Sequence, residues 1–344
     1  MKKRALLKSA LFALTAALGS AAQAQNTPIR FQLDWRFEGP AAFFLLPVAK
    51  GYFRDAKLDV NVDAGTGSGA AVQRVASGSY EMGFADLAAL MEFHANNPDT
   101  LNKPVAVMMV YNNTPAAVMA LKKSGIRTPA DLAGKKLGAP VFDAGRRAFP
   151  IFQKANAIPG VTWVSMDPPL RETMLARGDI DAITGFSFTS LLNLEARGVK
   201  LDDVVTLPYP QHGVKLYGNV IIASPRLVRE NPAAIKAFLA AFTRGAKDVM
   251  ANPDAAIDSV KARDGIVNVE LERRRLKMAI ADAIASPDAR AEGFGQVNPG
   301  RLSLMASQVS DAFSTKTRVS PEAVWNGTFL PTKAELNILP PVKK

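Results

Sequence analysis

The chain has 344 residues, of which 48% are hydrophobic and 21% charged, and its formal net charge is +11. That length favours two domains, and the absence of cysteine excludes disulfides, thiolate metal sites and cysteine nucleophiles. The basic residues are spread among 31 acidic ones. The densest basic group, Arg273-Arg274-Arg275, lies beside glutamates, so we interpret it as a solvated helix face. We expect no nucleic acid as a partner, because no aromatic residues alternate with these charges.

The first 24 residues have the three parts of a secretory signal peptide. Residues 2–4 are basic, residues 6–18 are largely apolar, and residues 22–24 read Ala-Gln-Ala, with small residues where a signal peptidase cuts. The apolar part is too short to cross the roughly 30 Å of bilayer hydrocarbon. We therefore expect cleavage after Ala24 and a periplasmic protein that is not inserted in the membrane.

Predicted strands and helices alternate through the next part of the chain. In order they are strand 29–33, helix 41–53, strand 58–62, helix 70–77, strand 82–85, helix 87–95 and strand 105–111. The pattern then restarts with strand 136–139, helix 146–156, strand 161–165, helix 171–177 and strands 181–186 and 204–207. After residues 217–223 most of residues 231–314 have helical periodicity. The alternation predicts an α/β fold of two lobes, each with its own mostly parallel sheet flanked by helices.

Several short motifs occur in this order along the chain: Leu33-Asp34-Trp35, KGYF at 50–53, VASGSYEMGFAD at 75–86, TPADLAGK at 128–135, RGDIDAI at 177–183 and YGN at 217–219. Together they resemble one branch of the periplasmic solute-binding proteins of ABC importers, the nitrate/sulfonate/taurine and thiamine-pyrimidine-precursor branch. The resemblance covers most of residues 28–250.

The resemblance implies a two-lobed periplasmic binding protein clamshell of type II. Lobe 1 would hold residues 26–113 and 222–344, and lobe 2 residues 114–221, with a hinge near 111–115 and 217–224. A small-molecule ligand would be captured between the lobes, and an inner-membrane ABC permease would recognise the closed form.

Ligands of open α/β sheets bind beyond the carboxyl ends of the strands. Trp35 follows the first strand and offers a flat face to a planar ligand, although it is also suited to a core position. Gly67 and Ser68 lie in a glycine-rich turn before a helix, whose free N–H groups favour an anion. The alternative for Ser68 is an ordinary helix N-cap.

Two further loops supply the remaining candidates. Asn112 and Asn113 lie at the first crossing, where turn chemistry alone is a sufficient explanation. Phe186 ends a predicted strand and is a reasonable wall for the same cleft. We name all three as candidate ligand-binding residues.

Arg146 and Arg147 are predicted to lie in the first turn of a helix. Cations are unfavourable there unless an anion or an acidic N-cap such as Asp143 offsets them. We expect one of the two arginines to meet the ligand. With Trp35, they predict a small organic solute that is anionic and partly planar; sulfonate, carboxylate and heterocycle all stay open.

The sequence offers little support for an enzyme. It contains no GxSxG or HExxH motif and only two histidines, and we expect no metal and no cofactor. Gly65, Gly67 and Ala70 imitate a dinucleotide-binding fingerprint, but an exported protein lacks ready access to NAD. A eukaryotic branch of the superfamily makes the thiamine pyrimidine with a histidine soon after the Asp-Trp pair and a cysteine-rich segment. Residues 36–40, RFEGP, lack that histidine.

An exported lyase or isomerase on the same clamshell scaffold stays open as the alternative. Such an enzyme would need a titratable pair in the cleft. The acids placed for that role are Asp34, Glu38 and Asp86.

We predict that a Gram-negative host processes the chain and accumulates it in the periplasm. N-terminal sequencing of the periplasmic fraction should then begin at Gln25, because signal peptidase reads the small residues before it. Full-length chain in the membrane fraction would instead identify the apolar segment as a retained anchor.

Overall fold

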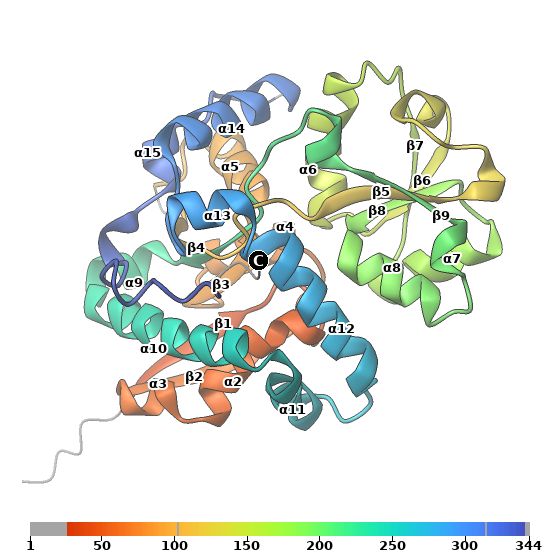
Figure 1. The fold of residues 1–344 in the computed structure, drawn as a ribbon. Coiled ribbons are helices and arrows are strands. Elements are labelled where there is room, and N and C mark those ends of the chain that lie inside the picture. The colour runs from red at the N-terminus through yellow and green to blue at the C-terminus, as the bar shows by residue number, and fades with distance from the viewer. Residues whose placement is uncertain (1–25, 102, 314, 341–344) are drawn as a thin grey trace, which may run out of the picture.

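The computed structural model describes residues 26–101, 103–313 and 315–340. The predicted signal peptide and its cleavage site after Ala24 lie outside the described residues. Two five-stranded sheets, each flanked by helices, form two lobes that lie side by side (Figure 1). The predicted two-lobed α/β architecture is confirmed. Among the described helices, none combines the length and the apolar character that a membrane crossing requires.

The first sheet has the order β2-β1-β3-β10-β4. Its strands are β1 (Thr27–Gln32), β2 (Leu58–Asp63), β3 (Met82–Asp86), β4 (Val105–Met109) and β10 (Asn219–Ala223). Strand β1 is parallel to β2 and β3, and β10 is antiparallel to both its neighbours. The edge strand β2 alternates buried and exposed residues, whereas β3 and β10 are buried throughout. Burial on both faces explains why β3 and β10 are apolar apart from Asp86 and Asn219 at one end of each.

The second sheet repeats this topology in the order β7-β6-β8-β5-β9. Its strands are β5 (Ala116–Leu121), β6 (Lys136–Ala139), β7 (Thr162–Ser165), β8 (Ala182–Phe186) and β9 (Val204–Pro208). Strand β5 is antiparallel to both β8 and β9. The chain therefore enters the second sheet between β4 and β5 and returns between β9 and β10. Since β10 lies wholly in the first sheet, we propose that the second crossing ends before Asn219.

The helices cover both sheets and fill the C-terminal third of the chain. They are α2 (Ala42–Ala49), α3 (Tyr52–Asp55), α4 (Ser68–Ala76), α5 (Leu87–Asn96), α6 (Ala144–Ala155), α7 (Arg171–Arg177), α8 (Ser187–Glu195), α9 (Pro225–Glu230), α10 (Pro232–Ala251), α11 (Pro253–Arg263), α12 (Val269–Ala279), α13 (Pro287–Glu292), α14 (Pro299–Ala312) and α15 (Pro321–Val324). The predicted helix 41–53 is two helices, because Gly51 adopts a left-handed conformation between them. Asn231 and Asn252 cap α10 and α11, as Asn-Pro pairs predict.

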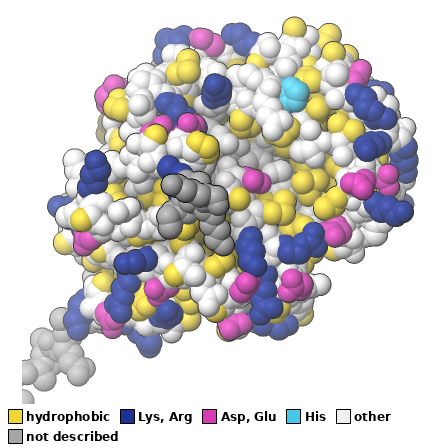
Figure 2. All heavy atoms as spheres, viewed as in Figure 1, with side chains coloured by type: hydrophobic (Ala, Val, Ile, Leu, Met, Phe, Trp, Pro, Cys, Tyr) yellow, Lys and Arg dark blue, Asp and Glu magenta, His cyan; other side chains and the backbone are white. Residues whose placement is uncertain are grey.

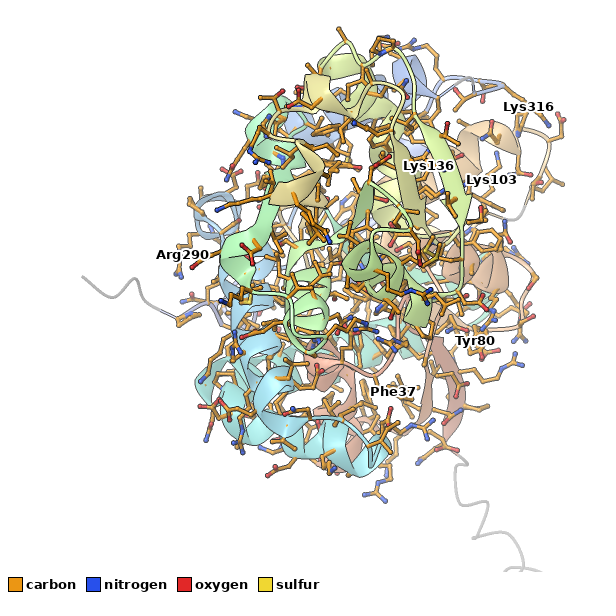
Figure 3. The ribbon with its side chains drawn as sticks, turned by 90° about the vertical axis from the view of Figure 1, so that its right-hand side faces the viewer. Phe37, Tyr80, Lys103, Lys136, Arg290 and Lys316 are labelled. Carbon is orange, nitrogen blue, oxygen red and sulfur yellow. The ribbon has the colours of Figure 1, made fainter. Side chains whose placement is uncertain are left out.

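Helices from the two lobes also contact each other. Helix α6 of the second lobe packs against α5 and α14 of the first, and α8 packs against α12. Figure 3 shows the green helices of the second lobe directly above the cyan C-terminal helices of the first. The structure is therefore a closed form, with the lobes in contact on two sides.

Phe238 on α10 belongs to the aromatic core of the first lobe. It is fully buried and stacks on Phe31 and Phe53, with ring centroids 5.2 and 4.7 Å apart. We predict that Phe238→Ala lowers the free energy of unfolding by about 3–5 kcal/mol, because it removes buried surface and leaves a cavity. Urea unfolding measures this change. Ile266→Ala is the control and should change little, since Ile266 is 92% exposed.

Candidate functional site

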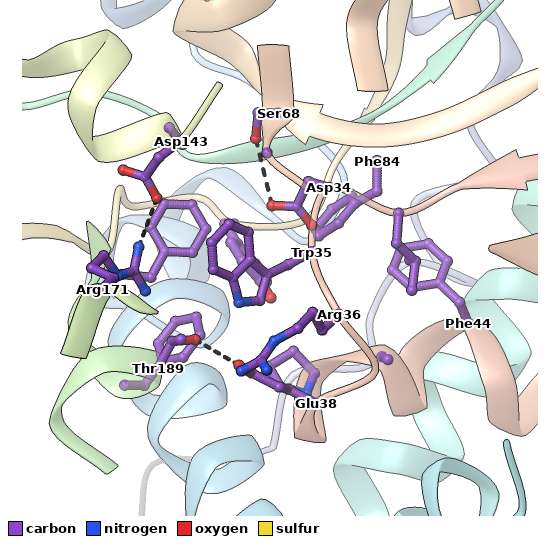
Figure 4. A pocket seen from close by; sticks show the side chains of 18 residues that line it. Asp34, Trp35, Arg36, Glu38, Phe44, Ser68, Phe84, Asp143, Arg171 and Thr189 are labelled. Carbon is purple, nitrogen blue, oxygen red and sulfur yellow. Dashed lines mark hydrogen bonds and ion pairs between the residues drawn. The ribbon is translucent and has the colours of Figure 1, made fainter. Parts of the chain in front are cut away.

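A cavity lies between the two lobes, beyond the carboxyl ends of β1, β3 and β8. Its empty volume is about 570 Å³, including the part open to solvent. The lining residues are Leu33, Asp34, Trp35, Arg36, Glu38, Pro40, Ala41, Phe44, Gly67, Ser68, Phe84, Tyr111, Asp143, Ala144, Arg171, Phe186, Phe188 and Thr189 (Figure 4). Both lobes contribute residues to the wall, so the cavity is a candidate site for a small ligand.

Six of the 18 residues that line the cavity are aromatic. Tyr111 makes edge contacts with Phe84, Phe186 and Phe188, with ring centroids 5.2, 6.2 and 6.1 Å apart. The Trp35 ring lies 5.0 Å from the guanidinium carbon of Arg171. Rings from both lobes therefore enclose the space, an arrangement that suits a flat apolar ligand.

Four of the residues predicted from the sequence line this cavity: Trp35, Gly67, Ser68 and Phe186. The Gly67 backbone has a φ of 139°, and a Cβ there would lie 2.2 Å from the carbonyl oxygen of Phe142 in the other lobe. Gly67 is thus required for the close approach of the lobes. Ser68 is the first residue of α4 and makes no N-cap; its hydroxyl accepts a hydrogen bond from the backbone N–H of Asp86.

Asn112 and Asn113 do not line the cavity. The Asn112 amide donates to Glu292, and its side-chain oxygen accepts from Arg301. The backbone N–H of Asn113 donates to the carbonyl of Ala283. Both asparagines therefore attach the first crossing to the C-terminal helices. The sequence contains no signal that predicts these contacts.

Arg146 and Arg147 are also absent from the cavity lining. Asp143 caps α6, as the alternative interpretation expects, and its side chain accepts from the backbone N–H of Arg146. The Arg146 guanidinium lies 4.7 Å from the Trp163 ring, while Arg147 forms a 2.7 Å ion pair with Glu92 of the first lobe. Their charges are offset by protein groups, so neither requires an anionic ligand. Their predicted role as ligand contacts has no support in this geometry.

The arginines that line the cavity are Arg36 and Arg171, and Arg171, at the start of α7, is the buried one. Its side chain is 1% exposed and pairs with Asp143 at 2.9 Å and with Glu172 at 2.8 Å. It passes over Gly185, where a Cβ would lie 2.5 Å from a guanidinium nitrogen. The sequence signal for this contact is Gly185 itself, because a glycine near the end of a buried strand indicates that another group approaches the backbone closely.

Asp34 is a buried carboxylate on the cavity wall. Its Oδ2 accepts from the Asn219 amide at 2.7 Å and from the Ser68 hydroxyl at 3.5 Å. Among the described residues no lysine or arginine forms an ion pair with it. Burial therefore raises the pKa of Asp34 to about 7, since its hydrogen bonds only partly offset the lost hydration. At neutral pH this group both accepts and donates hydrogen bonds.

Glu38 faces the same cavity in a different environment. Burial opposes its ionisation, but the charges of Arg275 and Arg36 and the hydrogen bond from Thr189 outweigh that effect. The pKa of Glu38 is therefore held below its usual value, and the group is ionised. Asp34 and Glu38 thus differ in protonation although they are only four residues apart.

Trp35 carries a polar group without a partner. Its indole Nε1–H is buried, and no acceptor for it occurs among residues 26–101, 103–313 and 315–340. A buried donor without an acceptor costs roughly 1–3 kcal/mol. A ligand with an acceptor atom at this point would remove that cost.

The raised pKa of Asp34 predicts a pH-dependent stability. A group whose pKa is higher in the folded state stabilises the fold when protonated, and that contribution is lost as pH rises from about 4 through 7. We expect the free energy of unfolding of the wild type, relative to Asp34→Asn, to fall by roughly 4 kcal/mol at most over this window. Urea unfolding at pH 4.5 and 8 measures it, with the exposed Asp59→Asn as control. Parallel pH profiles for wild type and Asp34→Asn would contradict the assignment.

Comparisons with known proteins show which proteins this chain resembles. A family model described as NMT1/THI5 like matches residues 41–256. A protein of Brucella abortus (strain 2308) that is named as a binding protein is 24% identical over 339 residues, which are 97% of this chain and 100% of the relative. A 4-amino-5-hydroxymethyl-2-methylpyrimidine phosphate synthase of Aspergillus parasiticus is 23% identical over 269 residues, 74% of this chain and 75% of the synthase.

Solved structures share the fold at low sequence identity. The alkanesulfonate-binding protein of Xanthomonas axonopodis pv. citri, solved with bound MOPS, matches with a TM-score of 0.67 and 16% identity, over 88% of this chain and 99% of that protein. The predicted periplasmic binding protein fold is therefore confirmed. Because the family model matches more than half of the sequence, the chain belongs to the NMT1/THI5-like family.

Proposed function

We propose that this protein is the solute-binding component of an ABC importer, which captures a small planar organic molecule between its lobes. The observation that carries the proposal is the aromatic cavity enclosed by residues of both lobes. A molecule that contacts both sides is fully bound only when the lobes are closed, so its binding energy shifts the open–closed equilibrium. Such a change is the signal that a permease can recognise.

The polar groups of the cavity define the chemistry of the solute. The unpartnered Trp35 Nε1–H requires an acceptor, and Asp34 accepts from a donor or donates when protonated. An acidic group on the solute would be better placed at Arg36 than at Arg171. The Arg36 side chain is 42% exposed and, in the part of the chain that the structure describes, pairs with Glu38 alone, whereas Arg171 is buried and pairs with two carboxylates. We therefore propose a flat ring that carries at least one acceptor and one donor, with an anionic substituent directed toward Arg36.

Periplasmic location and delivery to an inner-membrane permease are part of the same proposal. The predicted signal peptide supports export. Figure 2 shows basic and acidic side chains interspersed over the visible face rather than gathered in one basic patch. This pattern favours a small-molecule receptor over a nucleic-acid-binding protein, in which basic residues cluster.

An enzymatic function is the second candidate, and Asp34 is the observation that favours it. A cavity carboxyl with a pKa near 7 suits a general acid or base, and a synthase is among the relatives. The absence of cysteine and of a histidine after the Asp-Trp pair separates this chain from the eukaryotic enzymes. Conversion of a bound molecule by the purified protein, detected by mass spectrometry and lost in Asp34→Asn, would establish this alternative.

Native mass spectrometry of the protein purified from periplasm tests the receptor proposal. We expect one small molecule per chain, and compaction on its re-addition in small-angle scattering. Trp35→Ala should weaken its binding by more than roughly tenfold, or about 1.4 kcal/mol, because the mutation removes a cavity wall and a donor. Trp163→Phe and Trp325→Phe are the controls, since neither residue lines the cavity. Unchanged affinity in Trp35→Ala, or binding without compaction, would overturn the proposal.

A further inference from the structure

The three consecutive arginines of α12 occupy three different environments. Arg273 is 37% exposed and pairs with Glu270 within its own helix. Arg274 reaches Glu195 at the end of α8, in the other lobe, at 2.8 Å. Arg275 is 1% exposed. The sequence interpretation of this run as a solvated face is therefore wrong for Arg275. Successive helical residues point about 100° apart, and Arg275 is the one that is buried between α12 and α8.

Arg275 connects the two lobes through a dense set of hydrogen bonds. In its own lobe it binds Glu272, with Nε 2.9 Å from Oε2. Toward the second lobe it donates to the carbonyls of Phe188 and Thr189, at 3.1 and 2.8 Å, and to the Asn193 side chain at 3.0 Å. The nitrogens of the Arg275 guanidinium thus bond to both lobes. A planar guanidinium with several fixed N–H groups is better suited to bridging two lobes than a lysine ammonium.

The same network holds a residue of the cavity wall. An Arg275 nitrogen lies 3.5 Å from Glu38 Oε2, which also accepts from the Thr189 hydroxyl at 2.9 Å. Glu272 accepts at 2.5 Å from the backbone N–H of Gly39, the residue after Glu38. Arg275 itself does not line the cavity. It therefore reaches the binding site only through Glu38 and the turn that follows.

We propose that Arg275 is a positioning residue that stabilises the closed form, so that part of the solute-free population is closed, and that it fixes Glu38 on the cavity wall. This inference rests on the proposed function, in which closure accompanies binding. When the lobes separate, Arg275 loses its three acceptors on α8, and Glu38 loses the Thr189 hydroxyl. The closed form is thus favoured by contacts that the protein makes with itself, so a solute needs less binding energy to complete closure.

Solute-free protein tests the proposal without knowledge of the natural ligand. The chain is dialysed exhaustively, and Arg275→Met is compared with wild type by small-angle scattering and amide hydrogen exchange. We expect a larger radius of gyration and at least roughly tenfold faster exchange in residues 188–193, because these amides lie at the interface that opens. Arg273→Met is the matched control: it removes a cation from the same helix without touching the second lobe.

Three further variants separate bridging from other effects. Arg275→Met strands Glu272 and Glu38 as buried carboxylates, so Arg275→Met/Glu272→Gln removes one of these charges. This double variant should stay open, whereas a return to wild-type compactness would show that charge repulsion, not a lost bridge, separates the lobes. Arg275→Lys should restore only part of the compactness. Asn193→Ala removes one acceptor on α8 and should show a smaller opening, which keeps the test available if Arg275→Met does not fold.

The outcomes are distinct from those of the receptor proposal. Equal scattering and exchange for wild type, Arg275→Met and Asn193→Ala, with folding verified by circular dichroism, would overturn the role of Arg275. Failure to find any bound small molecule would overturn the solute-receptor function instead, since no solute enters the present measurement.

Discussion

Glu38 carries a negative charge that is almost completely withdrawn from water, and its partners come from both lobes. Arg36 and Arg275 belong to the first lobe and Thr189 to the second. An ionised carboxylate is stable in such a place only if charges and hydrogen bonds replace its hydration. The closed arrangement supplies them, and separation of the lobes would return the group to water. The closed arrangement of the lobes and the ionised state of Glu38 therefore depend on the same contacts.

The second lobe also contains a buried charge, and its own groups replace the hydration of that charge. Arg171 is buried between Asp143 and Glu172, and Gly185 provides the space through which its side chain passes. The cavity wall therefore combines six aromatic rings with charged groups that already have partners within the protein. The Trp35 indole N–H, the Asp34 carboxyl and the partly exposed Arg36 side chain are polar groups of the wall with capacity left for a ligand. Selectivity for a solute would thus come from a small number of directed hydrogen bonds on a flat apolar surface.

Binding proteins and a synthase both occur among the relatives of this chain. Such a family shows that a two-lobed scaffold limits function only broadly, and that the groups in the cleft decide between capture and catalysis. In this protein the cleft contains carboxyls of contrasting pKa but no thiol. A buried carboxyl can serve recognition by hydrogen bonding, and this is the simpler role for Asp34 beside Asn219 and Ser68.

The sequence by itself determined the class of fold and the positions of nearly all strands along the chain, because these depend on local periodicity. It also indicated the loops from which Trp35, Gly67, Ser68 and Phe186 reach the cavity, because these loops follow strand ends. It did not reveal β5, since AAVMAL is buried on both faces, shows no alternation and contains a single β-branched residue, Val118. It also indicated Arg146 and Arg147, rather than Arg171, as the arginines of the ligand site. Only the tertiary structure decided which arginines are neutralised by distant carboxylates and which residues meet across the lobes, because such pairing joins groups that have no relation in sequence.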